Sequence, residues 1–160
     1  SKFFKGFRYA INGIFYCIIN ERNFRFDIVV MAFVLIFKKF YSLSSVENII
    51  LYLTFAIVLS AEAFNTAIEA FVDLVSPKYN KLAKIAKDVS AGAVLVNAIF
   101  SFVIGIYLFW DIAVFKNIFS YFRENKLFSI LIIILIIISF IFVFGIKDKK
   151  NKNEDVNNGN

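Results

Sequence analysis

Histidine is absent from the 160 residues, and cysteine occurs once, as Cys17. A lone cysteine cannot form an internal disulfide or a thiol-metal cluster, so any metal chemistry must rest on carboxylates. Glycine is scarce, with six residues, and none of them forms a GxGxxG or GxxxxGK loop. The absence of these loops excludes a soluble nucleotide-binding kinase fold. The one proline, Pro77, lies in a turn with the sequence VSPKYN.

Apolar side chains make up 60% of the sequence, more than soluble proteins contain. Four long apolar runs cover residues 27–43, 46–75, 88–110 and 127–146. Each run can reach across ~30 Å of hydrocarbon, which takes about 20 helical residues, although the first run is slightly short. Because an isolated strand cannot satisfy its backbone in lipid, the sequence predicts an all-α membrane protein.

The predicted organisation is a membrane domain over residues 1–110, with a surface helix at 2–20 and spans at 26–43, 46–75 and 84–110. Basic residues interleaved with phenylalanines at the amino terminus favour a helix lying in the membrane interface. The alternative is a cleavable signal peptide, but no small-residue cleavage site follows. We expect an external linker at 111–126, a fourth span at 127–146 and a disordered cytoplasmic tail at 147–160.

Charge placement predicts the orientation, because Lys and Arg beside short loops stay on the cytoplasmic side. With the amino terminus inside and four crossings, thirteen of the eighteen Lys and Arg residues are cytoplasmic. We therefore predict a multi-pass protein of the cytoplasmic (inner) membrane with both ends inside. The basic balance indicates topology and anionic lipid, not nucleic-acid binding.

One predicted span carries a polar stripe. The stretch AEAFNTAIEAFVDL, residues 61–74, contains Glu62, Asn65, Glu69 and Asp73. At about 100° per residue these side chains fall within roughly 80° of one another on a helix. A charged residue at the bilayer centre costs ~2.5–3.5 kcal/mol on insertion scales, and Glu62 is the deepest of the three acids. Snorkelling or bonding to a neighbouring helix is the alternative explanation, but three stacked acids favour a functional site.

Two further polar clusters are candidate partners for the stripe. In NERNFR, residues 20–25, Glu21 and Arg25 lie one turn apart, and a simple ion pair between them is the alternative role. In KLAKIAKDVSAGAV, residues 81–94, Lys87 and Asp88 lie where the third span begins. Snorkelling lysines are the alternative there.

These groups suit phosphoryl transfer if the three helices converge at the cytoplasmic interface. Mg²⁺ prefers carboxylate oxygens together with substrate phosphates, and Glu21 and Glu69 can supply the carboxylates. Phosphoryl transfer also needs a lysine near the phosphates, which Lys87 can provide, and a carboxylate that accepts a hydroxyl proton. We predict Glu62 as this base, because it lies two helical turns deeper than Glu69, where a lipid hydroxyl can reach it.

At these residues the sequence resembles the bacterial integral-membrane diacylglycerol kinase and undecaprenol kinase family. The resemblance covers residues 2–110 and is carried by NERNF, EAFNTAIEAFVDL and LAKIAKDVSAGAV, in the order and spacing of the family. It implies a small kinase with an amphipathic surface helix and three transmembrane helices per subunit. It also implies a homotrimer whose active sites lie at subunit boundaries and face the cytoplasm.

The resemblance implies a role for each matching position. Glu62 would be the proton acceptor, and Glu21 and Glu69 the ligands of Mg²⁺. The implied ATP contacts are Tyr9, Glu21, Glu69, Lys78, Tyr79, Asn80, Lys87 and Asp88. The implied contacts with the lipid alcohol are Asn23, Arg25, Glu62, Asn65 and Ala91.

The substrate implied by the resemblance is a lipid alcohol. ERNF and KDVSAGAV look like the Gram-positive branch, which phosphorylates undecaprenol, whereas the diacylglycerol branch usually has a Gly-Ser pair where this chain has Ser90 and Ala91. We favour a polyprenol, with diacylglycerol as the alternative. From other classes, a small ion- or proton-coupled transporter and a purely structural membrane subunit remain as competitors. The span at 127–146 is an addition to the family pattern.

Overall fold

The computed structural model describes residues 2–146, so the predicted tail at 147–160 lies outside the described residues. This part of the chain forms helices and no strand, which confirms the predicted all-α class. The helices are α1 (Lys2–Asn20), α2 (Arg22–Phe37), the short 3-10 helix η1 (Lys38–Phe40), α3 (Ser45–Val75), α4 (Lys81–Phe109), α5 (Ile112–Glu124) and α6 (Lys126–Phe144).

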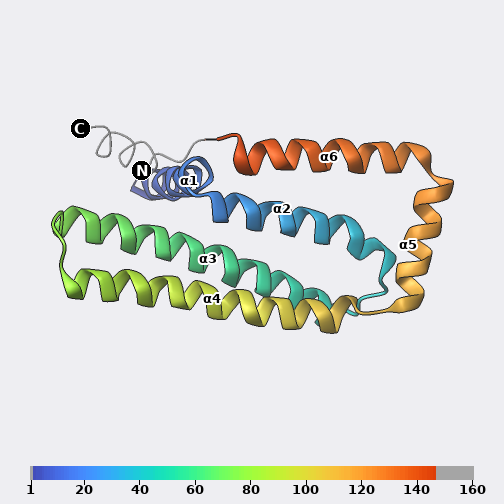
Figure 1. Ribbon diagram of the computed structural model, residues 1–160, viewed down its shortest axis with the longest axis horizontal. Coiled ribbons are helices and arrows are strands. Elements are labelled where there is room, and N and C mark those ends of the chain that lie inside the picture. Colours follow the sequence, from blue (N-terminus) through green and yellow to red (C-terminus); the bar gives the residue numbers. More distant parts are fainter. Residues whose placement is uncertain (1, 147–160) are drawn as a thin grey trace.

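Four helices, α2, α3, α4 and α6, run lengthwise beside one another (Figure 1). Helices α3 and α4 make the most extensive contact, while α2 packs on α3 on one side and on α6 on the other. At one end lie α1, the start of α2, the loop between α3 and α4, and the C-terminal end of α6; at the other, α5 crosses from α4 to α6. We call these the α1 end and the α5 end.

Three helices are long and apolar enough to cross a membrane: α3, α4 and α6. With 31 and 29 residues, α3 and α4 extend about 46 and 44 Å, so their ends project beyond ~30 Å of hydrocarbon. Helix α2 has only 16 residues and is not one of the three. Together with η1, α2 extends about 30 Å, because a 3-10 turn rises more per residue. The chain is a multi-pass membrane protein.

Local sequence signals account for the helix boundaries. Ser44 and Glu47 form a capping box at the start of α3, with the Ser44 amide donating to Glu47 Oε2 at 2.7 Å. Helix α3 ends at Val75, two residues before Pro77, because a proline disfavours helical backbone in the residue that precedes it. Asn80 then caps α4, with Oδ1 accepting from the Leu82 amide at 2.8 Å.

The segment predicted as an external linker contains helix α5. Asp111 starts it, with Oδ1 accepting from the amides of Ala113 at 2.8 Å and Val114 at 3.2 Å. A cluster of aromatic rings joins η1 and α2 to α5 and α6 at this end. Its members, which we call the aromatic cluster, are Phe37, Phe40, Tyr121, Phe122 and Phe128.

Most side chains of the described chain are exposed, as expected for helices that face lipid. The buried polar side chains gather toward the α1 end, on α1, α2, α3 and α4. They are Asn20, Arg25, Glu62, Thr66 and Ser90. Burying a polar group costs free energy unless it is hydrogen-bonded, so these side chains need partners inside the chain.

Candidate functional site

Glu62 lies on the face of α3 that is covered by the rest of the chain, and its exposed fraction is only 5%. One turn further, the Thr66 hydroxyl donates to the Glu62 carbonyl at 3.0 Å and is buried with it. Small residues on both helices let α1 approach this face of α3, and a cavity of about 370 Å³ remains between them. It is lined by Ala10, Gly13, Ile14, Tyr16, Cys17, Ala63, Thr66, Ala67 and Ala70.

The Cys17 thiol reports which charges surround this contact. Burial raises the pKa of Cys17 above its ordinary value, while a hydrogen bond with Thr66 lowers it. The carboxylates of Glu21 and Glu62 raise this pKa further, because negative charge disfavours a thiolate. Glu21 and Glu62 therefore act on the same thiol, although they belong to different helices.

A hydrogen-bond chain connects the polar stripe of α3 to α4. Asn65 Nδ2 donates to Glu69 Oε1 at 2.9 Å, and the buried Ser90 hydroxyl lies 2.6 Å from Asn65 Oδ1. The same hydroxyl lies 2.9 Å from the Lys87 carbonyl. The Glu69 carboxylate is thus oriented by a side chain that α4 itself holds in position. Ser90 was not among the predicted site residues, although it follows Asp88 in the motif.

Lys87 forms an ion pair with Asp73, the last acid of the stripe. The two side chains are 35% and 60% exposed. An exposed pair of this kind contributes at most about 1 kcal/mol, so its attraction does not account for stability. It holds the lysine ammonium over the end of α3, on the side where Glu69 lies one turn away.

Arg25 is fully buried, with an exposed fraction of 0%. Its Nη1 donates to the Ile18 and Ile19 carbonyls of α1, each at 3.1 Å. Its Nε and Nη2 donate to the Val143 carbonyl at 3.3 and 3.1 Å, and Nη2 also to the Ile146 carbonyl at 3.1 Å. The guanidinium therefore closes the C-terminal ends of both α1 and α6, where backbone carbonyls lack helical partners and the helix dipole is negative.

Oxygen ligands suited to a hard divalent cation lie at the junction of α1 and α2. Glu21 is half-buried and adopts an extended backbone as the first flanking residue of α2. Beside it, the Oδ1 atom of buried Asn20 has no hydrogen-bond partner among the described residues. Carboxylate and amide oxygens are the donors that Mg²⁺ accepts. Within residues 2–146 no group of three or more acidic or thiol side chains gathers.

The other predicted contacts lie around this site on exposed surfaces. Asn80 uses its side-chain oxygen to cap α4. Tyr9 is 63% and Tyr79 is 84% exposed. The remaining exposed predicted residues are Asn23, Lys78, Asp88 and Ala91. The single chain thus places Glu21 and Glu62 near the Cys17 thiol, on the side of α3 that faces α1. It places Glu69 and Lys87 in the network between α3 and α4. The exposed positions are open to a ligand or another subunit.

Comparison with known proteins identifies the chain. The pattern that defines the family described as prokaryotic diacylglycerol kinase matches residues 8–109. The chain belongs to this family. The match confirms the predicted family and lipid-kinase class, and it contains α2, α3, α4 and the candidate site but not α5 or α6.

Individual relatives sharpen the match to the diacylglycerol kinase family. The undecaprenol kinase of Bacillus subtilis is 43% identical over 109 residues, covering 68% of this chain and 89% of the relative. The diacylglycerol kinase of Synechocystis is 41% identical over 100 residues, covering 62% of this chain but only 57% of the relative. The diacylglycerol kinase of Escherichia coli is 27% identical over 111 residues, covering 69% of this chain and 91% of the relative. The similarity to the Bacillus relative agrees with the predicted Gram-positive branch.

Proposed function

We propose that the chain transfers the γ-phosphate of ATP to undecaprenol, giving undecaprenyl phosphate and ADP. The observation that carries this proposal is the buried carboxylate of Glu62, held in an apolar helix next to an acid-and-lysine cluster. A carboxylate is not kept buried in a membrane helix without a partner or a role, because its desolvation is costly. The 43% identity to an undecaprenol kinase supports the polyprenol as acceptor.

In the proposed reaction the lipid hydroxyl oxygen attacks the γ-phosphorus of ATP. An oxygen–phosphorus bond forms as the bond from that phosphorus to the β,γ-bridging oxygen breaks, and ADP leaves with the electron pair. Glu62 accepts the hydroxyl proton. Lys87 exchanges Asp73 for the nucleotide phosphates and offsets their charge. Asp88, which follows Lys87 in the sequence, and the exposed Tyr9 would add further contacts with the nucleotide.

Glu21 and Glu69 would hold Mg²⁺ with the nucleotide phosphates, and their hard oxygen donors fit this ion. When bound, the ion neutralises charge on the phosphates during transfer. Asn65 orients Glu69 through its 2.9 Å hydrogen bond, and Ser90 fixes Asn65 in turn. The remaining nucleotide contacts would come from the α3–α4 loop, through Lys78, Tyr79 and Asn80.

The proposed assembly is a homotrimer in the cytoplasmic membrane, with the site at the α1 end facing the cytoplasm. A cavity of about 440 Å³ lies between α3 and α4 beside Asn65 and Ser90, so the network borders a surface that a second subunit can cover. Lipid contacts are proposed for Asn23, Asn65 and Ala91 around Glu62. Arg25 would contribute to the lipid site indirectly, because its hydrogen bonds to the Ile18 and Ile19 carbonyls hold α1 and α2 together at Glu21.

The test uses the purified full chain in lipid vesicles with radiolabelled ATP, offered separately with undecaprenol and with diacylglycerol. We expect label in the polyprenol, and loss of label when Mg²⁺ is chelated. Lys87→Met should raise the KM for ATP by roughly tenfold or more, because a charge-assisted contact is worth about 1.5–3 kcal/mol. An absence of label in any lipid alcohol would overturn the proposal.

Diacylglycerol is the second candidate acceptor. The 41% identity to the Synechocystis diacylglycerol kinase favours it, at a level close to that of the Bacillus relative. The ratio of the two labelled products decides between the acceptors, since both compete for the same base.

A further inference from the structure

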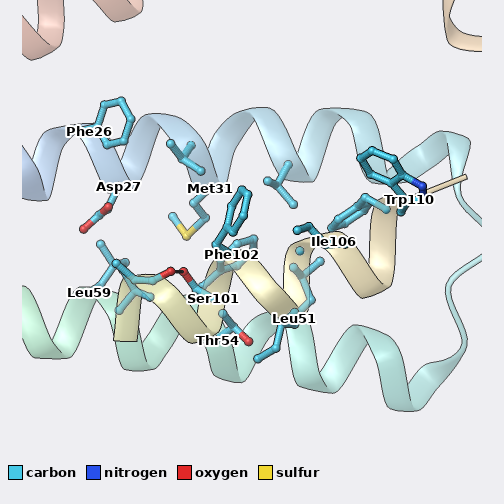
Figure 2. Close-up of a pocket in the computed structure, with 18 of the residues that line it drawn as sticks. Phe26, Asp27, Met31, Leu51, Thr54, Leu59, Ser101, Phe102, Ile106 and Trp110 are labelled. Atoms are coloured by element: carbon cyan, nitrogen blue, oxygen red, sulfur yellow. Dashed lines mark hydrogen bonds between the residues drawn. The ribbon is translucent and has the colours of Figure 1, made fainter. Parts of the chain in front are cut away.

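A groove of about 500 Å³ lies between α2, α3 and α4, and α5 closes one end of it. Figure 2 shows Asp27 of α2 and Leu59 of α3 at one end and Trp110 at the other. Along α4 the lining runs from Ala98 to Trp110, about 18 Å at the helical rise. The groove therefore extends lengthwise through the part of the bundle that lies in hydrocarbon.

The middle of this groove offers nothing to a polar ligand. The Thr54 hydroxyl donates to the Ile50 carbonyl at 2.8 Å, and the Ser101 hydroxyl donates to the Ala98 carbonyl at 2.9 Å. Both hydroxyls are thus satisfied within their own helices. Apart from these two, the polar groups among the lining residues are the Asp27 carboxyl at one end and the Trp110 indole N–H at the other. A hydrocarbon with its polar group toward Asp27 matches this distribution.

The polar end of the groove is adjacent to the proposed catalytic base. Leu59 lies three residues before Glu62 on α3, about 4.5 Å along the helix axis. Glu62 does not itself line the groove, but the tail of an alcohol bound at Glu62 would start within about one helical turn of it. At the far end Trp110 and Phe115 meet edge to face, with ring centroids 6.3 Å apart. Both residues lie beyond the segment that matches the family pattern, 8–109.

We propose that this groove binds the first isoprene units of the lipid alcohol, and that Trp110 and Phe115 set its length. The inference rests on the proposed function and specifies its substrate. If a methylene takes about the volume of a water, ~30 Å³, the groove holds on the order of 15–20 carbon atoms of one chain. The rest of a longer tail leaves between α2 and α4 into lipid. A two-tailed diacylglycerol can insert only one tail, so a single-tailed prenol is preferred.

The first experiment measures phosphorylation of prenols of increasing length by the full chain in vesicles. In wild type, kcat/KM should rise with length up to about 15–20 carbons and then level off. Gly105→Phe fills the groove, because a Cβ at Gly105 meets no heavy atom within 4 Å. It should lower kcat/KM for long prenols by about tenfold, as misfit in an apolar pocket does. Phe115→Ala should move the levelling point to longer prenols.

Val103→Phe is the matched control for Gly105→Phe. Val103 is 44% exposed on the same helix and does not line the groove, so the added ring faces outward. The proposal is overturned if Gly105→Phe and Val103→Phe behave alike, or if the length dependence of wild type has no levelling point. It is also overturned if Gly105→Phe changes the oligomeric state seen by crosslinking, because a second copy of the chain would then occupy the groove.

A binding measurement without ATP separates this inference from the proposed function. Trp110 is the only tryptophan of the chain and lies at the groove, so a polyene-tailed isoprenoid alcohol that enters should quench its fluorescence. We expect saturable quenching that undecaprenol competes away and that Gly105→Phe abolishes. Saturable quenching with no phosphorylated lipid would refute the kinase proposal but retain the groove. Phosphorylated lipid without saturable quenching would refute the groove alone.

Discussion

At the α1 end of the bundle the chain buries polar side chains, whereas at the α5 end it packs aromatic rings against one another. Arg25 and Glu62 are 0% and 5% exposed, although each is charged in water. At the other end Phe40 meets Tyr121 and Phe128 edge to face, with centroids 5.2 and 6.4 Å apart. The α1 end thus carries the desolvation cost of buried polar side chains, which only their hydrogen bonds offset, whereas the α5 end gains stability from contacts between aromatic rings.

The same two ends explain how the added helices attach. The family pattern stops at residue 109, so α5 and α6 have to dock on a domain that matches without them. At the α5 end the aromatic cluster ties them to η1 and α2, and the Lys39 ammonium lies 4.2 Å from the centre of the Phe128 ring. At the α1 end, Arg25 binds the Val143 carbonyl of α6 and the Ile146 carbonyl just after the helix. Helix α6 is therefore held at both ends.

Glu62→Gln should give the largest effect, because it removes the proposed base from the α1 end. We expect turnover with ATP and prenol to fall by about 10²–10⁴-fold, the usual contribution of a general base. The unfolding midpoint should stay the same or rise, since a neutral amide is less costly to bury.

Glu47→Gln is the matched control for Glu62→Gln at the α5 end. Glutamine can replace glutamate in a capping box, so turnover and stability should both stay near wild type. Normal turnover in Glu62→Gln, or equal losses in the two variants, would refute the division of roles between the ends.

Arg25→Gln should have the largest effect on stability. It leaves several buried carbonyls of α1 and α6 without their charged donor, and we expect a loss of about 3 kcal/mol in the free energy of unfolding. Arg25→Lys should recover only part of this loss, because an ammonium cannot reach both helix ends at once. Unfolding in a denaturing detergent titration measures both.

Arg22→Gln serves as the comparison for Arg25→Gln. Arg22 is exposed, and its guanidinium lies 6.0 Å from the centre of the Phe144 ring, so its loss should cost under about 1 kcal/mol. If Arg25→Gln were no more destabilising than Arg22→Gln, Arg25 would not hold α6.

Phe40→Ala should destabilise the α5 end by about 2 kcal/mol, because it removes ring contacts with Phe37, Tyr121 and Phe128. Turnover should change little, since the proposed base lies toward the other end. Phe119→Ala, at a 68% exposed position of α5, should cost less than about 0.5 kcal/mol. A large drop in turnover with unchanged stability in Phe40→Ala would contradict the assignment of stability to this end.

The sequence predicted α3 and α4 to within a few residues at each boundary, because long apolar runs with clear caps leave one structure available in lipid. It did not reveal α5 in the predicted linker, where polar and charged residues interrupt the apolar ones within only 13 positions. The sequence also did not predict that Arg25 binds the C-terminal end of α6. Its partners there are backbone carbonyls about 120 positions away, and a carbonyl carries no residue-specific signal.

The candidate site was predictable in part for a similar reason. The polar stripe of α3 follows from helical periodicity alone, so Glu62, Asn65 and Glu69 could be assigned to one face. The link from Asn65 to Ser90 depends on how α3 and α4 are rotated against each other, and periodicity does not contain that angle. The apolar groove likewise depends on the spacing of three helices.

The smallest effect we predict is a shift in the pKa of Cys17, which tests whether Glu21, Glu62 and Thr66 converge on α1. Burial raises this pKa, so Cys17 should react with a maleimide only at higher pH than a cysteine introduced at exposed Asn12 in a Cys17→Ser background. Glu21→Gln should lower the pH of half-maximal reaction, because it removes a negative charge that disfavours the thiolate. Thr66→Val should raise it, because it removes a hydrogen bond that favours the thiolate. Glu47→Gln at the α5 end should leave the pH of half-maximal reaction unchanged. If Glu21→Gln, Thr66→Val and Glu47→Gln all shifted this pH in the same direction, the acids would not gather at the α1 end.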